Sequence, residues 1–199
     1  MRNKASNAPE RKRDSSERKR DSSERERDSR KRAKRVRLMF FDVDGVLTDG
    51  RLWYGPSGEA LKSFCALDGH GMKMAMQAGI TVALLSGRNS PAVAVRAAEL
   101  GVAHVLQGVD DKLAAFGTLC GRLGMAAEEA GFMGDELVDL PVLRRCGFAC
   151  APPGAHALVR GHVHYVARAP AGTGAAREVC DFLMRSQGTL KAALARYLA

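Results

Sequence analysis

Short apolar runs alternate with segments of helical spacing along most of this chain, and this alternation limits the possible fold more than any other feature. Buried strands are expected over residues 36–43, 80–85, 102–106, 131–134, 147–150 and 163–166. Helices are expected over residues 69–78, 91–100, 111–123, 136–146, 155–160 and 175–185. Strands that alternate with helices across short loops form a parallel sheet with helices on both faces. The sequence therefore predicts an α/β fold with a doubly wound, Rossmann-like parallel sheet.

Turn and cap residues refine this prediction. The residues Gly55-Pro56-Ser57-Gly58 separate two short strand-like segments, 51–54 and 59–64, which indicates a β-hairpin. Ser90 is expected to be the N-cap of the helix that starts at Pro91. Asp110 or Asp111 opens the next helix, which ends near residue 123. The hairpin lies outside the predicted sheet and its helices.

The first 35 residues differ from the rest of the chain. The heptad ERKRDSS occurs at residues 10–16 and 17–23, and a variant, ERERDSR, follows at 24–30. No position of the repeat is apolar, so it cannot form the buried seam of a coiled coil, and we expect residues 1–35 to be a disordered basic extension. A folded domain is predicted over residues 36–190, with a C-terminal tail over 191–199.

The charge of the chain is concentrated in that extension. The first 35 residues hold 15 of the 31 Lys and Arg residues, whereas the remainder is close to neutral although the whole chain carries a formal charge of +9. This argues against nucleic acid as a ligand of the domain and leaves it open for the basic arm alone. No apolar run is long enough to span a bilayer, and five cysteines without a CxxC pair are typical of a reducing compartment. We therefore expect a cytoplasmic protein with no membrane partner.

Polar side chains follow four of the predicted strands, at the edge where ligands bind in such sheets. Asp42 and Asp44 end the first strand with one residue between them, which directs both carboxylates to the same side. Each piece alone is weak evidence, because Asp commonly ends strands and caps helices. The ordered combination is strong. The full set is Asp42, Asp44, Ser86, Gly87, Arg88, Lys112, Asp135, Glu136 and Asp139.

This set has the chemistry of phosphoryl transfer. Clustered carboxylates are the oxygen ligands that Mg²⁺ prefers. A lysine, a serine and unhindered backbone amides are suited to a phosphate dianion. One carboxylate can then attack phosphorus to give an aspartyl-phosphate, while a second protonates the leaving oxygen and later activates water.

The motifs resemble those of the haloacid-dehalogenase-type phosphatase superfamily. The matching residues are Asp42-Val43-Asp44-Gly45, Ser86, Lys112, Gly134-Asp135 and Asp139. The resemblance implies that Asp42 is the nucleophile and Asp44 the general acid and base. It also implies that Asp42, the Asp44 carbonyl and Asp135 hold Mg²⁺, that Ser86, Gly87 and Lys112 bind the phosphate, and that Glu136 and Asp139 support the metal ligands.

A narrower resemblance, over residues 36–190, is to the family of 3-deoxy-D-manno-octulosonate 8-phosphate phosphatases. It is carried by DVDGVLTDG (42–50), DGHGM (68–72), QGVDDK (107–112), GDELVDLPVL (134–143) and GTGAAREVCDFL (172–183). It implies a minimal cap formed by the hairpin and a role in lipopolysaccharide biosynthesis. It also implies a homotetramer in which the hairpin and the tail of a neighbouring subunit help to close the site. The residues that it places near the sugar acid are Cys65, Ala66, Leu67, Asp68, Gly69, Lys73, Arg88 and Arg96.

Other interpretations stay open at this point. The substrate could be a nonulosonate 9-phosphate or another sugar phosphate instead of the octulosonate 8-phosphate. A domain of the same fold could also act in assembly without catalysis, although the presence of all four acidic and basic motifs argues against this. A phospho-acceptor receiver domain also combines an acidic cluster, a hydroxyl and a lysine, but it does not place Asp-x-Asp-Gly at the end of the first strand before a hairpin.

Overall fold

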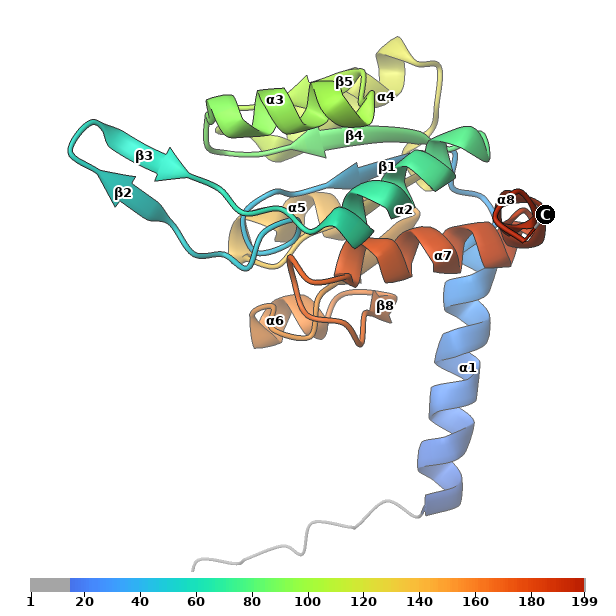
Figure 1. Ribbon diagram of the computed structural model, residues 1–199. Helices are drawn as coiled ribbons and strands as arrows, with labels where there is room; N and C mark the ends of the chain where they lie inside the picture. The colour runs from blue at the N-terminus through green and yellow to red at the C-terminus, as the bar shows by residue number, and fades with distance from the viewer. Residues whose placement is uncertain (1–14, 199) are drawn as a thin grey trace, which may run out of the picture.

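A six-stranded parallel sheet forms the centre of the molecule. The computed structural model describes the backbone of residues 15–198 and the side chains of residues 23–198. The strand order is β5-β4-β1-β6-β7-β8, and every neighbouring pair is parallel (Figure 1). The predicted α/β fold is confirmed. The strands are β1 (Leu38–Phe41), β4 (Thr81–Leu85), β5 (His104–Leu106), β6 (Ala130–Met133), β7 (Phe148–Ala151) and β8 (Tyr165–Val166).

The sheet is buried on both faces, and alternate residues of each strand serve different faces. Met39 and Phe41 of β1 pack in the core beneath α2 (Ala66–Gln77), α3 (Pro91–Leu100) and α7 (Ala175–Gln187). Leu38 and Phe40 pack in the opposite core, beneath α4 (Lys112–Arg122) and α5 (Leu140–Leu143). All four residues are fully buried, which explains why β1 appears in the sequence as a continuous apolar run instead of an alternating one.

The strand order creates the crevice that positions the site. The chain passes from β1 to β4 on one side of it, and β6 then pairs with the other side of β1. The chain segments that leave β1 and β6 therefore run to opposite sides of the sheet. The carboxyl end of β1 faces the open space between them, in which ligands of such sheets bind. Asp42 is the first residue after β1, and its backbone N–H donates to the carbonyl of Met133 at 2.9 Å.

The predicted hairpin is present. The strands β2 (Trp53–Gly55) and β3 (Gly58–Leu61) pair antiparallel and project from the body of the molecule beside the carboxyl end of the sheet (Figure 1). Trp53 and Leu61 are each 52% exposed, so the hairpin carries large apolar side chains that this chain alone does not cover.

The caps largely follow the sequence. Gly101 ends α3 with φ of +77°, a left-handed conformation that favours glycine, and Asp111 caps α4 by accepting the N–H of Ala114 at 2.9 Å. Ser90 occupies the N-cap position of α3, but its side chain makes no capping hydrogen bond. Its hydroxyl instead donates to Glu59 of the hairpin.

The predicted helix over 136–146 is wrong in length. A 3-10 turn, η2 (Leu137–Asp139), leads into the single turn of α5. Pro141 lies in the first turn of α5, where a missing N–H is tolerated, but it prevents a continuous helix from running through from η2. The chain also contains η1 (Ala127–Glu129), α6 (Ala157–Arg160) and α8 (Leu190–Ala195). Helix α8 begins at the last residue of the predicted domain and extends into the predicted tail.

The basic repeat forms a helix instead of the expected disordered arm. Helix α1 (Ser15–Ala33) contains i,i+4 ion pairs, such as Arg30 with Glu26 at 2.8 Å, that support an isolated helix. Its last turns also pack on the domain, because Ser29 and Ala33 are buried and Ser29 donates to the carbonyl of His164. The expectation therefore fails because tertiary contacts and ion pairs replace the missing apolar seam. Residues 1–14 of the predicted extension lie outside the described residues.

Across residues 15–198 no helix is both long enough and apolar enough to cross a bilayer.

Candidate active site

Four loops at the carboxyl edge of the sheet bring the predicted acidic and basic residues together. A cavity of about 260 Å³ opens there, next to the end of β1. Predicted catalytic, phosphate-binding and metal-binding residues from all four loops line it, together with glycines that keep the backbone accessible. The lining residues are Asp42, Asp44, Gly45, Gly50, Ser86, Gly87, Arg88, Lys112, Asp135, Glu136 and Val138.

Lys112 lies between two carboxylates. Its Nζ is 3.1 Å from Oδ1 of Asp42 and 2.7 Å from Oδ1 of Asp139. Burial alone would lower the pKa of Lys112, but the charges of Asp42 and Asp139 outweigh burial and raise that pKa. The lysine is therefore held as a cation at the base of the cavity, where a phosphate would need it.

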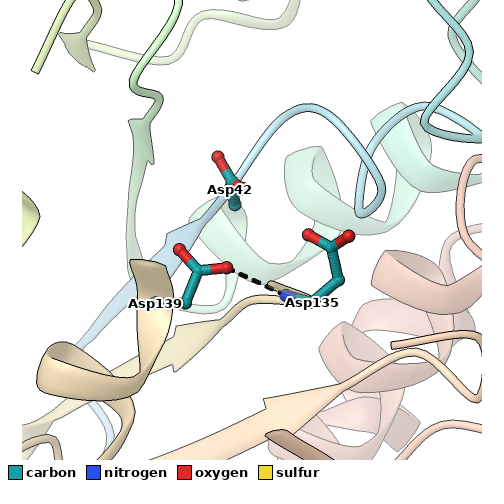
Figure 2. A group of neighbouring side chains, drawn as sticks. All are labelled: Asp42, Asp135 and Asp139. Carbon is teal, nitrogen blue, oxygen red and sulfur yellow. Dashed lines mark hydrogen bonds between the residues drawn. The ribbon is translucent and has the colours of Figure 1, made fainter. Parts of the chain in front are cut away.

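Asp139 connects the lysine to the loop after β6. Its side chain is fully buried, and its Oδ2 accepts the backbone N–H of Asp135 at 3.0 Å (Figure 2). The same oxygen accepts the backbone N–H of Glu136 at 3.1 Å. Both oxygens of Asp139 are therefore in use, one by Lys112 and one by this loop. Glu136, by contrast, is exposed, and its carboxylate caps η2 by accepting the N–H of Leu137 at 2.7 Å.

Asp135 lies close to the chain that leaves β1. A Cβ built on Gly45 would be 2.0 Å from Oδ2 of Asp135, and Gly45 has φ of +81°, so only glycine fits between the two segments. Oδ1 of Asp135 is buried and has no hydrogen-bond partner within residues 15–198. A buried carboxylate oxygen without a partner is costly, which indicates that a ligand completes the site.

The residues present fit a divalent cation. Each of Asp42, Asp135 and Asp139 offers an oxygen within 4.8 Å of the others. Burial, with a further contribution from the neighbouring carboxylates, raises the pKa of Asp42 and of Asp135 to about 7. A bound cation would remove this cost of ionisation. Because Asp139 already uses both oxygens, Asp42 and Asp135 are the residues that would hold Mg²⁺, together with the Asp44 carbonyl that the sequence predicts.

The segment after β4 supplies the predicted phosphate contacts. Ser86 is buried, and its Oγ accepts the backbone N–H of Arg88 at 3.2 Å, which fixes the turn around Gly87. Gly87 is exposed and carries no side chain to cover its amide. Both residues line the cavity, as do Lys112 and Asp135.

Sequence reasoning missed the contribution of the hairpin. Lys62 forms an ion pair with Asp44, and Arg88 donates to the Tyr54 hydroxyl at 2.7 Å and lies 3.4 Å from Glu59. These contacts tie the hairpin to the residues of the cavity. The only sequence signal was the position of Glu59 and Lys62 three residues apart in the second hairpin segment, which does not tell which way that segment faces.

The residues predicted to bind the sugar acid form two groups. Arg88 lines the cavity, whereas the segment 65–69, Lys73 and Arg96 do not. Arg96 instead lies 3.4 Å from the carbonyl of Cys65 and 2.9 Å from Glu99, and Lys73 donates to the carbonyl of Glu99 at 3.4 Å. Within one chain, therefore, Arg96 and Lys73 flank Glu99 apart from the cavity, and their role in substrate binding stays a prediction.

Asp68, in the middle of that segment, is buried and faces inward. Its carboxylate accepts the N–H of Gly174 at 3.1 Å and of Arg177 at 2.8 Å, at the start of α7. Burial raises the pKa of Asp68, and these hydrogen bonds lower it in part. The side chain of Asp68 therefore joins α2 to α7 in this chain.

We expect Gly45→Ala to weaken cation binding. The added methyl would collide with Asp135 and strain a left-handed backbone, so Asp135 must move. The Mg²⁺ concentration for half-maximal turnover should rise at least about tenfold, in line with the loss of one well-placed ligand. The matched control is Gly121→Ala, since no atom lies within 4 Å of the corresponding Cβ on α4. Equal Mg²⁺ dependence in both variants would contradict the proposed position of the cation.

Comparisons with known proteins give a consistent result. No family model matches the chain. The 3-deoxy-D-manno-octulosonate 8-phosphate phosphatase KdsC of Escherichia coli strain K12 is 43% identical over 158 residues, which is 79% of this chain and 84% of that protein.

Two solved structures share the fold. The phosphatase of that name from Moraxella catarrhalis, in complex with magnesium, phosphate and the KDO molecule, aligns with a TM-score of 0.83 and 37% identity, over 85% of this chain and 97% of that one. The cobalt-bound deoxy-D-mannose-octulosonate 8-phosphate phosphatase (YrbI) from Haemophilus influenzae aligns with a TM-score of 0.79 and 40% identity, over 81% of this chain and 94% of that one.

Proposed function

Because the chain belongs to the haloacid-dehalogenase-type family of 3-deoxy-D-manno-octulosonate 8-phosphate phosphatases, we propose that it hydrolyses this sugar-acid phosphate to the free sugar acid and phosphate. It is a Mg²⁺-dependent phosphoric monoester hydrolase. The observation in this chain that carries the proposal is the meeting of Asp42, Lys112 and Asp135 around one cavity at the end of β1.

The first half-reaction uses Asp42 as the nucleophile. A carboxylate oxygen of Asp42 bonds to phosphorus while the bond from phosphorus to the sugar oxygen breaks, which leaves an aspartyl-phosphate. Asp44 donates its proton to the departing sugar oxygen. Lys112, which Asp139 holds at 2.7 Å, balances the negative charge on the phosphoryl oxygens. Ser86 and the Gly87 amide bind the same oxygens.

The second half-reaction restores the enzyme. Asp44, now ionised, accepts a proton from water, and the water oxygen bonds to phosphorus as the bond to Asp42 breaks. Asp42 and Asp135 would hold Mg²⁺, which would supply positive charge next to the phosphoryl group. The side chain of Asp42 is only 8% exposed and lines the cavity.

Assembly and substrate binding are connected in this proposal. The exposed apolar side chains of the hairpin, including Trp53 and Leu61, support a homotetramer in which neighbouring subunits cover them. Such a neighbour would bring the segment 65–69, Lys73 and Arg96 toward the sugar acid, whose carboxylate is matched by Arg88 in the cavity. The basic arm stays a candidate contact for an acidic partner.

The family membership also supports a role in lipopolysaccharide biosynthesis and a cytoplasmic location. All five cysteines are free thiols in the structure, and four of them are buried, as a reducing compartment permits.

A panel of phosphate esters tests the substrate assignment. We expect kcat/KM for 3-deoxy-D-manno-octulosonate 8-phosphate to exceed that for glucose 6-phosphate at least about 100-fold, because the second ester lacks the carboxylate that Arg88 would bind. A nonulosonate 9-phosphate is the informative competitor, since it keeps the carboxylate and lengthens the chain. A higher kcat/KM for that ester would reassign the substrate, and equal rates across the panel would leave a general phosphatase. No turnover of any ester would favour the assembly domain.

A further inference from the structure

Lys62 is a buried cation that the mechanism above does not use. It follows strand β3, and its side chain is only 2% exposed. Its Nζ forms an ion pair with Oδ1 of Asp44 and lies 3.1 Å from Oε2 of Glu59. Neither Lys62 nor Glu59 lines the cavity. Lys62 is thus buried between Glu59 and Asp44, the proposed general acid. A lysine is rarely buried in this way, so its position requires an explanation.

Glu59 joins this lysine to the segment after β4. One of its oxygens accepts the Ser90 hydroxyl, and the other lies near both Lys62 and Arg88, the latter at 3.4 Å. The hydrogen bond from Ser90 lowers the pKa of Glu59, with further contributions from Lys62 and Arg88, so Glu59 is ionised. The hairpin is thereby fixed to the loop that carries the predicted phosphate and sugar-acid contacts.

The contacts leave the two oxygens of Asp44 in different situations. Oδ1 is occupied by Lys62, whereas Oδ2 is buried, has no hydrogen-bond partner within residues 15–198, and has Arg88 Nε at 3.6 Å. Because Lys62 holds Oδ1, the oxygen without a hydrogen bond, Oδ2, is the one that is left to carry the proton. General acid catalysis depends on this orientation, because proton transfer requires hydrogen-bond geometry to the leaving oxygen.

We propose that Lys62, held by Glu59, is a positioning residue that orients Asp44 for proton transfer to the leaving oxygen. This inference rests on the proposed function, in which Asp44 is the general acid. In the step concerned, the bond between phosphorus and the ester oxygen breaks while the bond to Asp42 forms, and the ester oxygen takes the proton of Asp44. Lys62 makes no contact with the substrate and acts through Asp44 alone.

Leaving-group dependence tests the proposal. Phenyl phosphate needs a proton on its departing oxygen, whereas p-nitrophenyl phosphate departs as a stable anion and needs it little. For Lys62→Met we expect kcat/KM to fall about 30-fold or more for phenyl phosphate and less than about fivefold for p-nitrophenyl phosphate, within the range that general acid catalysis provides. The parameter kcat/KM reports the step in which the leaving group departs. Neither ester carries a sugar acid, so lost sugar binding cannot produce this difference.

The ratio of the two rates is measured on one preparation, so partial misfolding of Lys62→Met would lower both values equally. Asp44→Asn should show the same dependence more strongly, and Lys62→Arg should recover part of the phenyl phosphate activity. Lys31→Met, at an exposed position of α1, is the control and should leave both values unchanged.

Equal losses for both esters in Lys62→Met would overturn the positioning role and leave Lys62 as a structural ion pair. A loss confined to 3-deoxy-D-manno-octulosonate 8-phosphate would also overturn it, in favour of sugar binding. Failure of the proposed function looks different, because the wild-type enzyme would then show no preference for that sugar-acid phosphate.

Discussion

Asp42→Asn is expected to lower kcat by about 10⁴-fold or more, because the amide keeps the shape of the side chain but cannot attack phosphorus. The substitution should not lower the stability of the folded protein. Burial and the charge of Asp139 raise the pKa of Asp42 to about 7, so ionised Asp42 costs free energy in the folded state at about pH 8. Without added metal, the asparagine variant should therefore unfold at the same temperature as the wild type or higher.

The measurement is steady-state turnover of the sugar-acid phosphate beside a thermal unfolding curve in metal-free buffer. Asp181→Asn is the matched control, since Asp181 lies on α7 in a partly exposed ion pair with Arg177 at 2.9 Å. It should keep wild-type turnover. Near wild-type turnover of Asp42→Asn would remove Asp42 as the nucleophile, and a large fall in its unfolding temperature would give Asp42 a structural role instead.

The sheet and the central acidic cluster could be predicted from the sequence because the apolar runs locate the strands and the cluster lies at the strand ends. The continuous apolar run of β1 marks a strand buried on two faces, and parallel strands end at one edge. Asp42, Ser86, Lys112 and Asp135 therefore had to meet once the strands were located, and the structure places all four around one cavity.

The contacts of the hairpin could not be predicted in the same way. A hairpin signal gives two strands and a turn, but the direction in which Glu59 and Lys62 point depends on how the hairpin packs on the sheet. Asp68 shows the same limit, because the family resemblance places it near the sugar acid, whereas its carboxylate in this chain reaches α7, more than one hundred residues later.

The prediction of disorder for the basic repeat failed for a different physical reason. Without apolar residues, a helix in that segment has no seam to bury, and this favoured disorder. The structure stabilises α1 by ion pairs along the helix and by contacts of its last turns with the domain, including the Arg30 guanidinium over the Phe182 ring at 5.7 Å. Only the packed end of the helix depends on tertiary contacts. A repeat of polar residues does not reveal such contacts.

Removal of the divalent cation is expected to abolish turnover. Adding the cation back is expected to raise the thermal stability of the protein, by an amount that depends on pH. Burial raises the pKa of both Asp42 and Asp135 from 3.8 to about 7. In the metal-free protein the folded state therefore holds protons that the unfolded state has released, so these two groups make the free energy of unfolding fall as pH rises from about 4 to about 7. A bound cation stabilises the ionised carboxylates of the folded state, but it must compete with the protons for them.

The expected result is loss of activity in EDTA, recovery with Mg²⁺, and an Mg²⁺-dependent rise in unfolding temperature of about 5–10 °C at about pH 8, which corresponds to saturation near 100 times Kd. At about pH 5, where both carboxylates are protonated, the rise should nearly vanish. Asp135→Asn is the informative variant, since it should lose the rise at both pH values while Asp181→Asn keeps it. Undiminished turnover after exhaustive chelation, or an equal Mg²⁺ effect at both pH values, would contradict a cation held by Asp42 and Asp135.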